Sequence, residues 1–157
     1  MRLAFNVNHS IVLDSTAVIR TGLPEVDLLA GGAVGIGGGQ QRHATRASLA
    51  LTRGASGIRI DYDRRGASQL VTGTLATPDL LRFAPIATID LRAFAELNDI
   101  FPKAGFGRGT RVSLVVDNVA NQRQSVTDKA GNTPTAYQPL RRDPLGRTIM
   151  MELRLAF

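Results

Sequence analysis

The chain has 157 residues, with 19 basic and 13 acidic side chains, a formal charge of +6 and a sequence pI near 11.0. Cysteine and tryptophan are absent, whereas glycine occurs 16 times. These counts exclude a disulfide framework, a thiolate nucleophile and a cysteine-bound zinc, and no apolar run is long enough for a transmembrane helix. The length corresponds to one domain, and the glycine content favours strands and turns over a helical bundle.

The high pI is typical of nucleic-acid binders, but the rest of their signature is missing from the sequence. There is no helix pattern rich in Lys and Arg, and no aromatic stacking motif lies on a strand. The basic residues are scattered, with adjacent pairs only at Arg64-Arg65 and Arg141-Arg142. We therefore expect solvated charges and no nucleic-acid partner.

Six segments alternate apolar and polar residues with the period of two that is characteristic of β-strands. In chain order they are 2–20, 43–53, 58–64, 81–97, 111–118 and 148–157. The apolar sets that run through these segments contain no Lys, Arg, Asp or Glu, and the charges fall on the opposite face. The pattern predicts an all-β chain, an antiparallel up-and-down meander of about six long strands.

Two environments give a sheet one apolar and one polar face. They are the core of a soluble protein and the lipid around a transmembrane barrel. Segments 2–20 and 81–97 alternate for longer than the roughly 5–10 residues usual for soluble strands. This length favours a partial transmembrane β-barrel. A small soluble barrel or sandwich that binds an apolar ligand is the alternative.

The connections between the segments and the end of the chain favour the same interpretation. Outer-membrane barrels alternate long external loops with short periplasmic turns. The longer connections here are 21–42, 65–80 and 119–147, and the shorter ones are 54–57 and 98–110. The last segment ends on the apolar residue Phe157, whereas chain termini are usually frayed and polar.

Several stretches of the second half follow one another in a recognisable order. Residues 109–123 read GTRVSLVVDNVANQR, residues 137–148 contain YQP and DPLGRT, and the chain ends in MELRLAF. This succession, with 87–94 before it, resembles the last strands of TonB-dependent outer-membrane receptors. The family pattern V-x-N-L-F-(N/D)-x-R is matched with Val119-Ala120 in place of Leu-Phe. The family's C-terminal signal for the barrel assembly machinery corresponds here to Ile149, Met151, Leu153, Leu155 and Phe157.

The resemblance implies a gated importer of the cell outer membrane in Gram-negative bacteria, with outer-membrane lipid and the barrel assembly machinery as partners. Family cargoes include siderophores, other metal chelates and oligosaccharides; no cofactor and no catalysis are implied. No plug, TonB box or signal peptide is matched, and about 8 strands is the smallest number in closed barrels. We therefore expect residues 1–157 to be the C-terminal segment of such a receptor, inactive alone and linked to TonB only through an absent N-terminal part.

The polar face is the candidate functional surface, because in an importer its charges line the lumen and contact plug or cargo. The alternative is mutual neutralisation across neighbouring strands. The lumen candidates are Arg82, Asp90, Arg92, Arg111, Asp117, Glu152 and Arg154. Asp61 and Asp63 share a strand face and resemble a cation site, but nearby Arg59 and Arg65 favour ion pairs instead.

The sequence gives little support to catalysis. His9 and His43 are the only histidines, and no nucleophile motif accompanies them. The glycine-rich run 31–39 lacks the Gly-Lys-Ser/Thr ending of a phosphate loop, so an external loop is expected there. For the aromatic girdle of a barrel, the candidates are Tyr62, Phe83 and Phe157.

Overall fold

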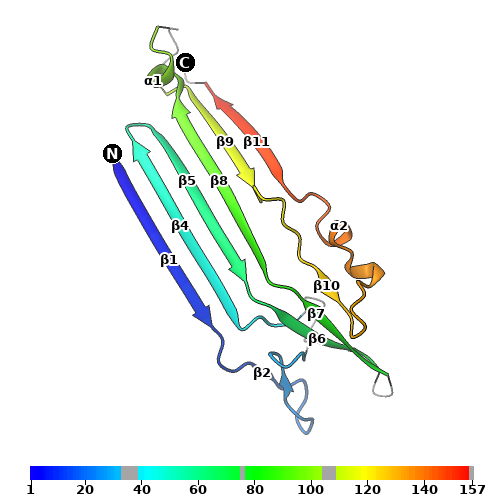
Figure 1. Ribbon diagram of the computed structural model, residues 1–157. Coiled ribbons are helices and arrows are strands. Elements are labelled where there is room, and N and C mark those ends of the chain that lie inside the picture. The colour runs from blue at the N-terminus through cyan, green and yellow to red at the C-terminus, as the bar shows by residue number, and fades with distance from the viewer. Residues whose placement is uncertain (33–38, 75–76, 104–108, 156–157) are drawn as a thin grey trace.

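A computed structural model describes residues 1–32, 39–74, 77–103 and 109–155. Its main feature is a six-stranded antiparallel sheet whose spatial order follows the order of the chain (Figure 1). The strands are β1 (Arg2–Ile11), β4 (His43–Arg53), β5 (Ser56–Arg65), β8 (Ile86–Glu96), β9 (Arg111–Asp117) and β11 (Thr148–Arg154). The predicted all-β meander is therefore confirmed. The sheet is open, and within the described residues β1 and β11 each pair on one side only.

Smaller elements extend this sheet at one end. β6 (Ser68–Gly73), β7 (Pro78–Phe83) and β10 (Val126–Thr127) form a three-stranded sheet, and β2 (Thr16–Ala17) pairs with β3 (Val26–Asp27). The helical elements are α1 (Leu97–Ile100), η1 (Thr135–Tyr137) and α2 (Pro139–Arg142). None of the helices in the described parts of the chain is long and apolar enough to span a membrane.

Two of the predicted strands are shorter than their alternation, and each of the three longer predicted connections contains a short strand. Segment 2–20 leaves the sheet after Ile11, the last residue with a partner on β4. Segment 81–97 breaks at Ala84-Pro85, because proline has no N–H to donate and Ala84 N donates to the Ser125 carbonyl instead, at 2.9 Å. The connection 65–80 contains β6, which pairs with β7 and prolongs the β5–β8 pair beyond the sheet.

The connections divide between the two ends of the six-stranded sheet (Figure 1). The three predicted long ones lie at one end, which we call the long-connection end. The opposite end carries the start of β1, the end of β11 and the turn at Gly54, whose φ of 58° suits a tight two-residue hairpin. The meander thus has the one-sided arrangement of long connections that the sequence predicts.

The buried core lies in the small sheet and not in the large one. Leu81, Phe83 and Val126 are buried there, and Leu70 and Tyr137 pack against them. The Tyr137 ring meets the Phe83 ring edge to face at 5.8 Å. Phe83 is only 3% exposed, so its predicted place in an aromatic girdle is wrong. Within the described residues, the six-stranded sheet buries none of its large apolar side chains.

Candidate functional site

The strand register assembles the predicted apolar sets on one face of the six-stranded sheet. One row crosses all six strands, because each residue lies directly opposite the next. The row is Phe5, Leu49, Ile60, Leu91, Val116 and Ile149. At its two ends, Phe5 is 70% exposed and Ile149 is 69% exposed. The apolar face is therefore assembled from distant segments and left uncovered by the described parts of the chain.

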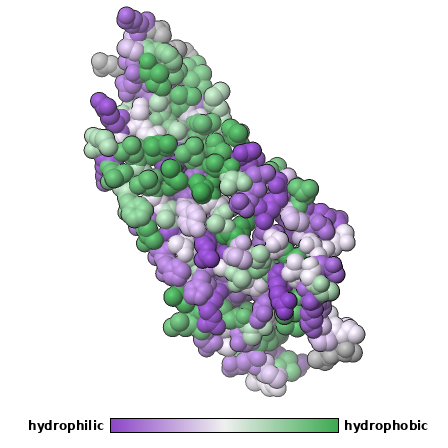
Figure 2. Space-filling view, viewed as in Figure 1, coloured by the Kyte–Doolittle hydropathy of each residue, from purple (hydrophilic) through white to green (hydrophobic). Residues whose placement is uncertain are grey.

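Along the strands, charged residues and histidines mark where this apolar face ends. Arg53 follows its last leucine on β4, and His43, Arg64 and His9 lie on the same face toward the long-connection end. On β8 the set runs from Ala87 to Ala95, nine residues that extend roughly 30 Å at about 3.3 Å per residue. Figure 2 shows hydrophobic surface gathered over the part of the sheet away from the long connections. A tilted strand needs about 9–11 residues to cross the hydrocarbon of a bilayer, so the lengths match.

The polar face gathers six of the seven predicted lumen candidates. Directly opposed pairs connect them, such as Arg154 with Arg111 and Glu152 with Ser113. The six are Asp90, Arg92, Arg111, Asp117, Glu152 and Arg154. Arg82 differs, because the break before Pro85 places it on β7, opposite Gln69 and Thr127 in the small sheet. The continuous strand on which its placement was predicted does not exist.

The charges of the polar face are partly satisfied by neighbours. Arg59 contacts the Asp61 carboxylate at 2.7 Å. Asp63 lies between Arg46, at 3.0 Å, and Arg65, at 3.7 Å. The ion pairs that the sequence predicts for the two aspartates are therefore present. Arg46 was not anticipated, because a cross-strand partner depends on register.

Three of the lumen candidates are held by contacts that the sequence analysis missed. The Arg111 guanidinium lies 4.2 Å from the centroid of the Phe94 ring and donates to the Ala55 carbonyl at 3.1 Å. Asp90 accepts a hydrogen bond from Asn118 N at 2.7 Å, and Asp117 accepts one from the Thr148 hydroxyl at 3.1 Å. These contacts fix the wall of the polar face at β8, β9 and β11.

The predicted C-terminal signal lies mostly on the edge strand. Ile149, Met151 and Leu153 share the apolar face of β11 and are exposed, and Leu155 follows the strand with its side chain also exposed. Phe157 lies outside the described residues. The alternating apolar residues of β11 thus lie on the apolar face of the sheet, which the described residues do not cover.

The histidines lie together at the border of the apolar face. Their rings stack with centroids 5.6 Å apart, and His9 Nδ1 is 2.8 Å from the Thr45 hydroxyl. Within the residues that the structure describes, no three His, Cys, Asp or Glu side chains gather as a metal site would require. Most of the glycine-rich run, from 33 to 38, lies outside the described residues.

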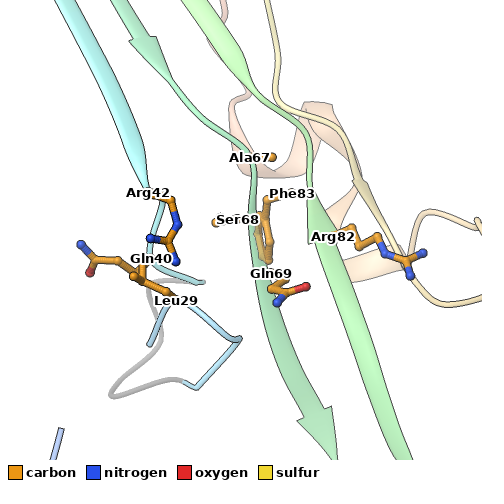
Figure 3. Close-up of a pocket in the computed structure, with 8 residues that line it drawn as sticks. All are labelled: Leu29, Gln40, Arg42, Ala67, Ser68, Gln69, Arg82 and Phe83. Carbon is orange, nitrogen blue, oxygen red and sulfur yellow. The ribbon is translucent and has the colours of Figure 1, made fainter. Parts of the chain in front are cut away.

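A pocket lies beyond the long-connection end of β4 and β5 (Figure 3). It has a volume of about 290 Å³ and lies between the residues that lead into β4 and the β6–β7 hairpin. Its lining includes Gln40 and Arg42 on one side and Ser68, Gln69 and Phe83 on the other. Arg82 also contributes to the wall, but its guanidinium points away from Arg42. No motif marked this pocket, because two separate connections build it.

No family model matches this chain, and neither the curated proteins nor the solved structures that were searched contain a match. The case for a function therefore rests on the two faces of the sheet and on the pocket at its end.

Proposed function

We propose that this chain forms part of the wall of a TonB-dependent receptor barrel in the bacterial outer membrane, as its C-terminal segment. The apolar face contacts lipid and the polar face contacts the lumen. The observation that carries the proposal is the uncovered apolar row that crosses all six strands, from Phe5 to Ile149. A soluble sheet hides such a face in a core, whereas a barrel exposes it to lipid.

Two further features support the membrane placement. The apolar set is about as long as a tilted membrane-spanning strand needs to be. The three long connections lie at one end of the sheet, as the external loops of outer-membrane barrels do. In this proposal the connections 12–42, 66–85 and 118–147 are external.

The two open edges of the sheet, β1 and β11, need further strands to pair with before the chain can function in a membrane. An unpaired strand edge in lipid leaves backbone N–H and C=O groups without partners, at a cost of several kcal/mol for each group. β1 and β11 therefore need further strands, inserted with the help of the barrel assembly machinery. We propose that the six strands alone do not transport and that contact with TonB requires an N-terminal part. The role is uptake of a siderophore, another metal chelate or an oligosaccharide, without catalysis.

The alternative is a soluble module that encloses an apolar ligand with the same apolar face. The two proposals differ in what they expect when the chain is refolded. In plain buffer the lipid-facing sheet is expected to aggregate, and in detergent micelles it is expected to give a sheet circular dichroism spectrum. Detergent below its critical micelle concentration is the matched control. A monodisperse, folded monomer in plain buffer contradicts the membrane proposal.

A further inference from the structure

Three adjoining pockets at the long-connection end share arginine and amide linings. The pocket of about 290 Å³ shares Ser68 and Phe83 with a smaller one of about 70 Å³, which is also lined by Arg142. It shares Gln40 and Arg42 with a third, of about 260 Å³, that reaches the polar face of the sheet. Among the described residues, no acidic side chain lines any of the three. We call this combined surface the arginine pocket.

Two arginines of the arginine pocket are held in place by neutral groups. Arg42 Nη1 donates to the carbonyl oxygens of Val12, at 3.4 Å, and Leu13, at 3.2 Å. Arg142 Nη1 donates to Gln124 Oε1 at 3.1 Å, and its guanidinium lies 5.2 Å from the centroid of the Phe83 ring. Such contacts orient a guanidinium but leave its charge uncompensated.

Two acidic residues of the connections, Asp27 and Asp143, accept hydrogen bonds from nearby backbone N–H groups. Asp27 accepts from the backbone N of Leu29, at 2.8 Å, and Asp143 accepts from Gly146 N, at 3.0 Å. Across the described ranges the three ion pairs all involve Asp61 or Asp63, inside the large sheet. Asp63 thus partly neutralises Arg46 and Arg65, which line the two smaller pockets. Within the described residues Arg42 and Arg142 have no ion pair, so they carry the uncompensated positive charge of the arginine pocket.

We propose that the arginine pocket binds a small anion with two or more carboxylate or phosphate groups. A guanidinium matches both groups with paired N–H donors, while Gln40, Gln69 and Ser68 offer neutral hydrogen bonds to the rest of the ligand. The main pocket lies at the lower limit of the about 300–1,000 Å³ typical of ligand sites, so a compact anion fits better than an oligosaccharide. The assignment of this anion as cargo rests on the proposed function; the binding itself does not.

The test is calorimetric titration of the full chain, refolded in micelles at low salt, with citrate as the carboxylate probe and pyrophosphate as the phosphate probe. Binding of either probe supports the site and identifies the group it recognises. Arg42→Gln and Arg142→Gln are each expected to weaken binding by about tenfold or more, because a charged hydrogen bond is lost. Arg53→Gln, at the opposite end of β4, is the matched control and is expected to bind as the unaltered chain does.

The outcomes separate this inference from the membrane proposal. A chain that folds in micelles but binds neither probe contradicts the anion site and leaves the membrane placement intact. Equal weakening by Arg53→Gln indicates unspecific attraction and also contradicts the site. If the chain folds in plain buffer instead, the same titration there tests the pocket while the membrane proposal fails. The circular dichroism spectrum of every variant verifies that the sheet is retained. Arg42→Lys, which preserves the charge, is included as an additional variant.

Discussion

Asn118 fastens the chain at the point where β9 leaves the sheet for a long connection. Its φ of 51° lies in the left-handed region, which asparagine tolerates better than most residues. The side chain is bonded in both directions to Gln122, donating to its carbonyl at 2.8 Å and accepting from its N at 2.9 Å. The residue is 8% exposed, so water does not readily replace these partners.

Replacement of Asn118 by alanine is expected to lower the free energy of unfolding by about 1–3 kcal/mol, since two buried hydrogen bonds are lost. Asn118→Gly loses the same bonds but relieves the left-handed backbone, and is expected to cost less. Urea unfolding in micelles measures both, with Asn8→Ala on exposed β1 as the control. A loss for Asn8→Ala as large as that for Asn118→Ala would show that the buried clamp is unimportant.

Sequence reasoning at this scale succeeds for contacts within one strand and fails across strands. The pairing of Asp61 with Arg59 was predictable, because residues two apart share a strand face. The contact of Arg46 with Asp63 and the stacking of Arg111 on Phe94 depend on which residues lie opposite one another. Alternation alone does not fix that register. The arginine pocket escaped prediction for a related reason, because its residues come from distant connections.

Among the elements, β7 and β10 form the part of the molecule with a core of its own. Phe83 lies at its centre, between Val126, Tyr137 and the Arg142 guanidinium. The six strands of the large sheet are held instead by backbone pairing and by whatever covers their apolar face. The two parts are therefore expected to respond differently to loss of a large side chain.

Phe83→Ala is expected to destabilise the small sheet by about 3–5 kcal/mol, the usual cost of removing a buried phenylalanine. Amide hydrogen exchange should accelerate in β6, β7 and β10 and remain slow in β5 and β8. The control is Phe5→Ala on exposed β1, which should leave exchange in the small sheet unchanged. Uniform acceleration along the whole chain would show that the two sheets unfold as one unit.

Element boundaries were predicted well for two inner strands of the large sheet. The predictions for 43–53 and 111–118 agree closely with β4 and β9, whose alternation is reinforced by two neighbours. The prediction for 2–20 overshoots, since the alternation persists beyond Ile11 although β4 offers no further partner. At Ala84-Pro85 the apolar pattern continues through a residue that has no N–H to contribute to the ladder.

At the scale of the whole molecule, the six-stranded sheet separates apolar from charged residues across its thickness. Leu114 and Ser113 are neighbours on β9, yet one faces Ala93 and Met151 whereas the other faces Phe94 and Glu152. A sheet that contacts lipid on only one face must respond unequally to charges placed on its two sides. This asymmetry makes the two positions a matched pair.

Leu114→Arg is expected to reduce stability in lipid vesicles by about 2–4 kcal/mol, the cost of a lipid-facing arginine near the bilayer midplane. Ser113→Arg lies beside Glu152 on the polar face and is expected to have a much smaller effect. Denaturant unfolding from vesicles measures the difference. Equal losses at the two positions would argue against lipid on one face only.

The most direct measurement of the central claim compares two apolar residues on opposite faces at similar depth, Leu91 and Val115. The chain has no cysteine, so a cysteine that replaces either residue is the single site for a spin label. Each labelled variant is studied in lipid vesicles. Paramagnetic resonance then compares relaxation by oxygen, which concentrates in lipid, with relaxation by a water-soluble nickel complex. We predict that oxygen dominates at position 91 and the nickel complex at position 115. Equal accessibility at both positions, or nickel dominance at 91, would contradict the lipid-facing sheet.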